Sequence, residues 1–146
     1  MLFRLLIAAV VVAVTVSGNV VLNLSPNHSL KPPIHDLATR FLLSGDVDPR
    51  PTSLRLCNGR PQSRASVWSR HPNPFTDWQA VLVFRVTGDP EHGGDGLGLW
   101  YSKNVGQVGA VNGGPGKWHG LGVFVDTDGT ETDGASRVIA ALNQND

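Results

Sequence analysis

Two short apolar runs in this sequence are bounded by glycine and carry an aspartate at one end. Residues 93–101 contain Asp95, and residues 120–128 end with Asp126 and Asp128. A carboxylate at the mouth of a buried strand is costly unless something pairs with it. Two such carboxylates could together hold a hard cation or bind sugar hydroxyls. The alternative is that both runs are core strands followed by ordinary Asp- and Gly-rich turns.

Residues 126–133 form a stretch rich in the hard oxygen donors that calcium prefers. An EF-hand is the first calcium loop to consider, and the spacing excludes it. With Asp126 in position one, Glu131 falls where the loop needs glycine, and Arg137 falls where it needs a bidentate glutamate. A calcium loop of another kind and a plain polar turn both stay open.

The rest of the composition excludes several other classes of function. Twelve Lys and Arg residues balance twelve Asp and Glu residues, so no basic field favours nucleic acid. The histidines and Cys57 lack His-x-x-x-His and Cys-x-x-Cys spacing, which argues against zinc. No phosphate loop and no Gly-x-Ser-x-Gly elbow occurs. A glycoside hydrolase needs two carboxylates facing one bond, and neither Glu91 nor Glu131 has an alternating acidic partner in a strand.

Alternating apolar residues predict the strands that would position the acidic side chains. The clearest strand covers residues 78–87, where Trp78, Ala80 and Leu82 begin a period of two that no helix would give. Further strands are predicted at residues 53–57, 65–69, 121–125 and 138–142, and in the run that contains Asp95. Residues 35–51 and 102–117 are predicted to be loops. These short strands, with seventeen glycines and ten prolines, favour an all-β sandwich.

Residues 1–18 have the layout of a secretory signal peptide. Arg4 precedes an apolar run from Leu5 to Val16, and small residues follow it. A run of about a dozen residues is too short to span a bilayer comfortably, although a signal anchor is the alternative. We therefore expect cleavage after Ser17 or Gly18 and a mature domain of residues 19–146 in the lumen of the endoplasmic reticulum.

Three side chains are candidates for covalent modification, namely Asn23, Asn27 and Cys57. Asn23 and Asn27 begin closely spaced glycosylation sequons, and Asn27 is the better candidate because Asn23 lies near the cleavage point. An unused sequon is the alternative. Cys57 is the single cysteine and cannot form an intramolecular disulfide. We expect its thiol to be buried in a strand, the alternative being an intermolecular partner.

Several landmarks in register resemble the eukaryotic L-type (legume-like) lectins of the early secretory pathway. This family includes the mannose lectins of the ER–Golgi intermediate compartment and the vesicular integral-membrane lectins. The landmarks are residues 66–68, Phe75, Trp78, residues 84–88 and 94–97, Trp100, Tyr101 and residues 120–124. The resemblance implies a legume-lectin-like (concanavalin-like) jelly-roll β-sandwich. It also implies that residues 28–34 are an opening strand, which their prolines would restrict to an edge.

The resemblance also implies a sugar site. Asp95 corresponds to the family's sugar-binding aspartate, which follows a cis peptide bond that would here join Gly94 to Asp95. Thr130 stands where the family has an asparagine that touches both calcium and sugar. Ser63 is one position away from a family serine near the sugar, and in a strand one residue of offset turns a side chain to the other face.

A calcium site next to the sugar is implied in the same way. Asp126 corresponds to a family ligand that binds through its carboxylate, and Asp128 to one that binds through its backbone carbonyl. Thr130 and Glu131 supply further oxygens in the same loop. We expect Ca²⁺ to bind weakly here, as in extracellular modules.

The function implied by the resemblance is non-enzymatic. We expect a lectin that recognises high-mannose N-glycans on secretory glycoproteins, in the lumen of the endoplasmic reticulum, the intermediate compartment or the Golgi. The family domain continues with further strands, a disulfide, a second sugar loop and usually a membrane anchor, so the resemblance implies a C-terminally truncated domain without the anchor. The alternatives are a remnant that no longer binds sugar and, less favoured, a sandwich-fold glycoside hydrolase.

Overall fold

The computed structural model describes residues 6–7, 9–16, 19–87, 94, 96–106, 108–127 and 137–144. Regular structure in these residues is mostly β-strand, joined by one 3₁₀ turn, η1 (Pro26–His28), and one short helix, α1 (Leu37–Arg40). The all-β class predicted from the sequence is confirmed. Within the described ranges, no helix is both long enough and apolar enough to cross a bilayer.

The strands of the described part form small antiparallel sheets with the orders β1–β6–β5, β3–β2–β8, β4–β7 and β11–β10–β9. Their bounds are β1 (Leu6–Ile7), β2 (Ala9–Val16), β3 (Asn19–Leu24), β4 (Phe41–Gly45), β5 (Asp48–Arg50), β6 (Ser53–Arg55), β7 (Ala65–Ser69), β8 (Gln79–Val83), β9 (Gly96–Ser102), β10 (His119–Asp126) and β11 (Arg137–Gln144). In the pairs β2–β3 and β5–β6, antiparallel pairing matches the short connection between successive strands, because parallel strands would need a long crossover.

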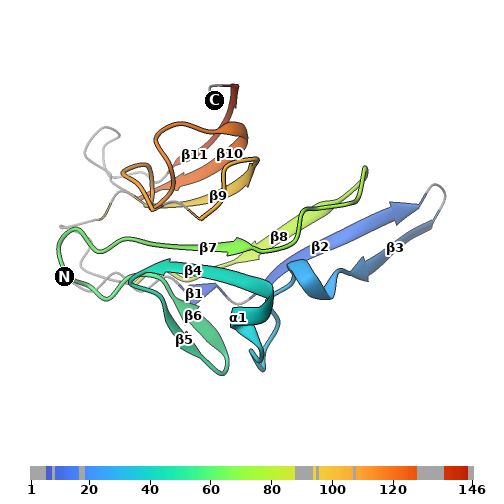
Figure 1. Ribbon diagram of the computed structural model, residues 1–146, viewed down its shortest axis with the longest axis horizontal. Helices are drawn as coiled ribbons and strands as arrows, with labels where there is room; N and C mark the ends of the chain where they lie inside the picture. The colour runs from blue at the N-terminus through green and yellow to red at the C-terminus, as the bar shows by residue number, and fades with distance from the viewer. Residues whose placement is uncertain are drawn as a thin grey trace.

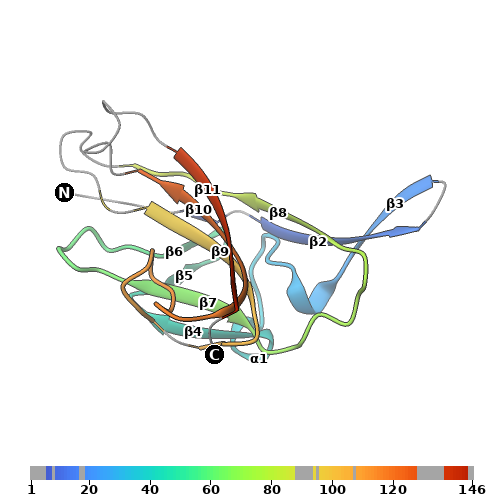
Figure 2. The ribbon, with the colours of Figure 1, turned by 90° about the horizontal axis from the view of Figure 1, so that it is seen from above.

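The strands lie in two layers. The sheet β9–β10–β11 lies over the strands β4, β7 and β8, and from above its strands cross those of β4 and β7 at an angle (Figures 1 and 2). Side chains of both layers line the space between them, including Leu97 and Leu121 from one layer and Val67 and Leu82 from the other. This is the sandwich arrangement that alternating apolar strands produce.

The enclosed core lies in the lower layer. It consists of Leu30, Phe41 and Leu54, whose exposed fractions are 2%, 4% and 0%. Partly buried apolar side chains surround it, namely Ile34, Leu37, Leu43, Leu56 and Val67. The helix α1 and the residues before it close this core from one side, since Ile34 and Leu37 come from that segment.

An aromatic cluster forms on the other face of the upper sheet. The rings of Trp100, Trp118 and Phe124 meet edge to face, and the Trp100 centroid lies 4.8 Å from Trp118 and 4.9 Å from Phe124. Gly114 must be glycine here, because a Cβ atom would lie 2.5 Å from the Trp100 ring. The glycine-rich segment predicted as a loop therefore folds back over β9, where it forms isolated bridges rather than strands.

Most strands with a clear alternating pattern are confirmed. Residues 65–69 form β7, residues 121–125 lie within β10 and residues 138–142 lie within β11. Residues 53–57 are strand only as far as Arg55. The strand predicted at residues 78–87 is shorter than expected. β8 covers Gln79–Val83, and Phe84 is 38% exposed beyond its end.

Two predictions for the segment between His28 and Pro51 are wrong. Residues 28–34 are not a strand: η1 ends at His28, and Arg40 donates to the backbone carbonyls of Pro26, Ser29 and His35 at 2.6, 2.9 and 3.0 Å. Within the predicted strand, a side chain thus takes the place of a strand partner for the Ser29 carbonyl. Residues 35–51 are not a loop, because they contain α1, β4 and β5, and β4 is completed by pairing with the distant β7.

The predicted signal peptide overlaps two strands. β1 pairs with β6, and β2 pairs with β8 from Ala9 to Ala13, so that Val10 lies opposite Leu82. An apolar run can form a strand wherever an apolar edge accepts it. Cleavage after Ser17 or Gly18 stays a prediction, and it would leave the β8 edge without this partner.

Candidate functional site

Antiparallel pairing brings the two aspartate-bearing runs together at one edge of the upper sheet. Asp126, at the end of β10, lies opposite Gly96, at the start of β9. Next to it, the Thr127 hydroxyl donates a hydrogen bond of 2.9 Å to the Gly94 carbonyl. Asp95 itself lies outside the described residues, but Gly96 after it pairs with the last residue of β10, and Gly94 before it binds the residue that follows β10.

Gly96 allows this close approach. Its φ of +126° is a backbone conformation that residues with a Cβ rarely adopt, and a Cβ there would lie 2.1 Å from the Val125 carbonyl oxygen. The chain therefore enters β9 tightly against β10. The predicted cis bond between Gly94 and Asp95 lies outside the described part of the chain.

Asp126 is a half-buried carboxylate at this edge. It lies between β9 and β11, with Gly96 opposite on one side and Arg137 opposite on the other. The other predicted calcium ligands, Asp128, Thr130 and Glu131, fall outside the described residues. Among those that are described, no group of three or more His, Cys, Asp or Glu side chains could hold a metal. The calcium site therefore stays a prediction, with Asp126 as its one described member.

Ser63 is already engaged in hydrogen bonds. Its hydroxyl donates to Asp46 Oδ2 at 3.0 Å and accepts from the Asn58 backbone N–H at 3.2 Å. The Asp46 backbone N–H in turn donates to the Arg64 carbonyl at 2.8 Å. Sequence reasoning missed Asp46 as the partner of Ser63, because the two residues are seventeen positions apart and no periodicity connects them.

A cavity joins these elements. It has a volume of about 1070 Å³, lies between the two layers, and is lined by Ser63, Gly94 and Gly96 among others. Ser63 and the two residues that flank Asp95 therefore face the same space. No local pattern in the sequence indicates a cavity, because its walls come from strands far apart along the chain.

The two sequons differ in what the structure describes. Asn27 lies in η1 and is exposed, whereas Ser29 of the same sequon is 5% exposed and its hydroxyl has no hydrogen-bond partner. A glycosylating enzyme that recognises both Asn27 and Ser29 would have to bind this segment before Ser29 is buried by folding. For Asn23 the structure describes only the backbone, within β3. Glycosylation of either asparagine stays a prediction.

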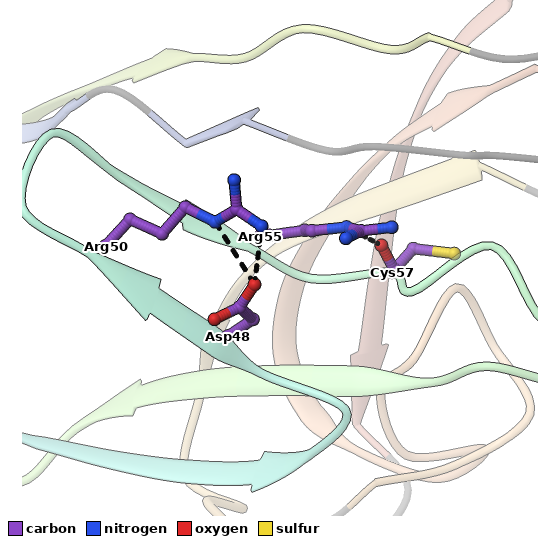
Figure 3. Close-up of polar contacts among 4 residues, drawn as sticks. All are labelled: Asp48, Arg50, Arg55 and Cys57. Carbon is purple, nitrogen blue, oxygen red and sulfur yellow. Dashed lines mark hydrogen bonds and ion pairs between the residues drawn. The ribbon is translucent and has the colours of Figure 1, made fainter.

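Cys57 is a free, half-buried thiol, so the prediction that it is buried in a strand is wrong. β6 ends at Arg55, whose side chain turns to donate to the Cys57 carbonyl at 2.8 Å (Figure 3). The nearby ion pair between Arg50 and Asp48, at 2.8 Å, is half exposed. An exposed pair of this kind contributes about 0–1 kcal/mol to stability.

Comparison with known proteins gives a consistent assignment. The sequence model of the legume-like lectin family matches residues 23–146. Mouse protein ERGIC-53 is 35% identical over 104 residues, which cover 69% of this chain and 20% of the relative. Mouse VIP36-like protein is 33% identical over 133 residues, covering 87% of this chain and 38% of the relative. The bovine VIP36-like protein is 33% identical over 126 residues. No solved structure matches.

The matched region is a minor part of these relatives, between 20% and 38% of their length. Their family is one of lectins, which points to a binding protein rather than an enzyme. The family match spans most of the described strands, including β9 and β10 with the edge at which Asp126 meets Gly96. The chain therefore belongs to the legume-like lectin family.

Proposed function

We propose that this chain is a calcium-dependent lectin that binds mannose-type N-glycans on secretory glycoproteins. The contact that supports it most directly is the hydrogen bond from Thr127 to the Gly94 carbonyl, with Asp126 opposite Gly96. It joins the two segments that would have to act together, one carrying the sugar-binding aspartate and the other the calcium loop. A site of this kind needs both segments at one sheet edge.

The chemistry of the residues fits this function. A carboxylate such as that of Asp95 accepts hydrogen bonds from two vicinal sugar hydroxyls at once. Calcium prefers six to eight oxygen ligands, and Asp126 begins a stretch of eight residues in which most side chains carry oxygen. A bound ion would fix the loop beside the sugar and reduce the conformational entropy that is lost on binding.

We place this lectin in the lumen of the early secretory pathway, as a receptor for glycoprotein cargo between the endoplasmic reticulum and the Golgi. The predicted signal peptide and the similarity to ERGIC-53 and VIP36-like proteins support this location. Both the cargo role and the preference for high-mannose glycans belong to the proposal.

The test is retention of the secreted protein on immobilised mannose with and without calcium. We expect Asp95→Asn to abolish retention, because loss of a charged acceptor in a binding site costs about 1.5–3 kcal/mol. Asp77→Asn is the matched control: its carboxylate is exposed, with only Thr76 at 3.5 Å. The control should bind like the wild type, and circular dichroism should be unchanged in both variants. Equal retention of Asp95→Asn and wild type would contradict the proposal.

One alternative is that the chain is a lectin remnant without sugar affinity. Two observations favour it: Thr130 stands in place of the family's asparagine, and the Ser63 hydroxyl is already bound to Asp46. The variant Thr130→Asn distinguishes a working lectin from a remnant. If the wild type is retained, this variant should be retained more strongly. If the wild type ignores mannose and only Thr130→Asn is retained, the chain is a remnant.

A further inference from the structure

The cavity between the two layers is apolar inside and cationic at its rim. Its lining includes the exposed side chains of Arg60, Arg64 and Lys103 and, among the described residues, no aspartate or glutamate. The three cationic side chains make no hydrogen bond or ion pair within the part of the chain that the structure describes. Twelve acidic residues balance the twelve basic ones in the whole sequence, so their absence from this lining is a local feature.

The walls of the cavity are large apolar and aromatic side chains from both layers. Leu99, Leu121 and Val123 line it from the upper sheet, and Val67 and Leu82 line it from the lower layer. At the side, the Trp78 and Tyr101 rings lie 4.6 Å apart between centroids, and Tyr101 is 46% exposed. Covering these apolar walls with an apolar ligand is favourable, because it removes their surface from water.

We propose that this cavity binds a single-chain anionic amphiphile, such as a long-chain fatty acid. The acyl chain would lie between the two layers, and the carboxylate would lie at the cationic rim. The volume of about 1070 Å³ lies just above the range of about 300–1,000 Å³ that is usual for small-molecule sites. Charge complementarity favours an anionic head group over a neutral one, since the described part of the lining has three unpaired cations and no carboxylate.

The proposed sugar site adjoins this cavity, which Ser63, Gly94 and Gly96 also line, but the amphiphile would use the apolar walls instead. A sugar presents hydroxyl groups and would leave the apolar walls of the cavity exposed, whereas an acyl chain would cover them. The two functions can therefore be tested apart, and the amphiphile assay uses neither calcium nor glycan.

The first experiment is a chain-length series with the wild-type protein. Laurate, myristate and palmitate are titrated below their micellar concentrations, with 1-hexadecanol as the neutral counterpart of palmitate. Because each buried methylene contributes about 0.8 kcal/mol, Kd should fall by about tenfold for every two methylenes added. Hexadecanol should bind at least about tenfold more weakly than palmitate, and high salt should weaken only the carboxylates. Equal affinity across the series, or for palmitate and hexadecanol, would overturn the proposal.

The second experiment locates the head group. Arg60→Gln with Arg64→Gln should weaken palmitate binding at least about tenfold and leave hexadecanol binding unchanged. Arg50→Gln with Arg85→Gln is the matched control, since it removes the same charge from side chains that do not line the cavity. If both double variants weaken palmitate binding equally, the attraction depends on the net charge of the protein, and the proposed head-group site at the rim is wrong.

The third experiment locates the acyl chain. Val123→Phe fills part of the cavity and should weaken palmitate more than laurate, whereas Val81→Phe, on a side chain that is 40% exposed outside the lining, should change neither. Palmitate brominated along its chain should quench tryptophan fluorescence, because Trp68 and Trp78 line the cavity. The quenching needs no variant, so it decides the question even if Val123→Phe fails to fold. Binding without quenching would place the chain elsewhere and contradict the proposal.

Discussion

The segment of residues 25–70 and the sheet β9–β10–β11 are both built from short apolar strands, yet they bury them to very different degrees. In the first, Leu54 has no exposed surface and Phe41 is 4% exposed. In the second, Leu97 and Phe124 on β9 and β10 are 5% and 7% exposed, but Val138 and Leu142 on β11 are 72% and 82% exposed. A strand pattern therefore shows which side chains could be buried, and a covering segment decides whether they are.

Polar contacts add to the difference. In the first segment, Arg40 donates to three backbone carbonyls and lies over the Phe41 ring at 5.5 Å. His28 Nε2 lies 3.0 and 3.2 Å from the carbonyl oxygens of His71 and Pro72, and Nδ1 lies 2.8 Å from the Ser25 hydroxyl. These contacts connect irregular backbone to its surroundings. The second region is held by its ladder and by the aromatic cluster on one face, and its other face lines a cavity of about 1070 Å³.

The largest expected effect is on the enclosed core. Leu54→Ala should lower the free energy of unfolding by about 2–5 kcal/mol, because the side chain is fully buried and its loss leaves a cavity. Leu142→Ala removes the same atoms from an exposed position and should change stability by less than about 0.5 kcal/mol. Urea unfolding of both variants measures the difference. Similar losses would show that β11 is covered in solution and that the contrast between the regions is wrong.

A smaller effect is expected at the entrance to β9. Gly96→Ala should lower the free energy of unfolding by about 1–3 kcal/mol, since its backbone conformation and the Val125 carbonyl both exclude a side chain. Gly116→Ala is the control, because a Cβ at that position meets nothing within 4 Å. It should be neutral or slightly stabilising. Hydrogen exchange would locate the loss in β9 and β10, and unchanged exchange there would argue against the close approach at Gly96.

The smallest of the three effects concerns the polar contacts of the first segment. Arg40→Met should lower the free energy of unfolding by about 1–2 kcal/mol, because three carbonyls lose a charged donor and part of the site remains open to water. Arg50→Met, which removes only an exposed ion pair with Asp48, should cost less than about 1 kcal/mol. Thermal unfolding of the two variants compares them. If Arg50→Met costs more, the Arg40 contacts do not stabilise the segment.

Predictions from the sequence succeeded where the information is local. β7, β10 and β11 are strands with alternating or continuously apolar residues, and a period of two can be read from a few neighbours. The glycine-rich segment around Gly114 was also predicted as a loop. In each case the signal lies within about ten residues of the chain.

Predictions failed where a distant group decides the local structure. The family resemblance predicted a strand at residues 28–34, but Arg40 binds the Ser29 carbonyl in this segment and the carbonyls of Pro26 and His35 on either side of it. β4 has few alternating residues of its own and becomes a strand through β7, so that Leu42 lies opposite Trp68. Cys57 lies beyond the end of its strand, because β6 stops at Arg55.

The sequence by itself determined the all-β class, the strands with clear periodicity and the family, because side-chain chemistry and spacing are written along the chain. Only the tertiary structure decided which of these residues meet. The Thr127 hydroxyl binds the Gly94 carbonyl at a sequence separation of thirty-three positions. Ser63 binds Asp46 at a separation of seventeen positions. The cavity has walls from both layers. Contacts at such separations depend on how whole sheets pack, and that is set by the sum of many burial and pairing energies rather than by any local pattern.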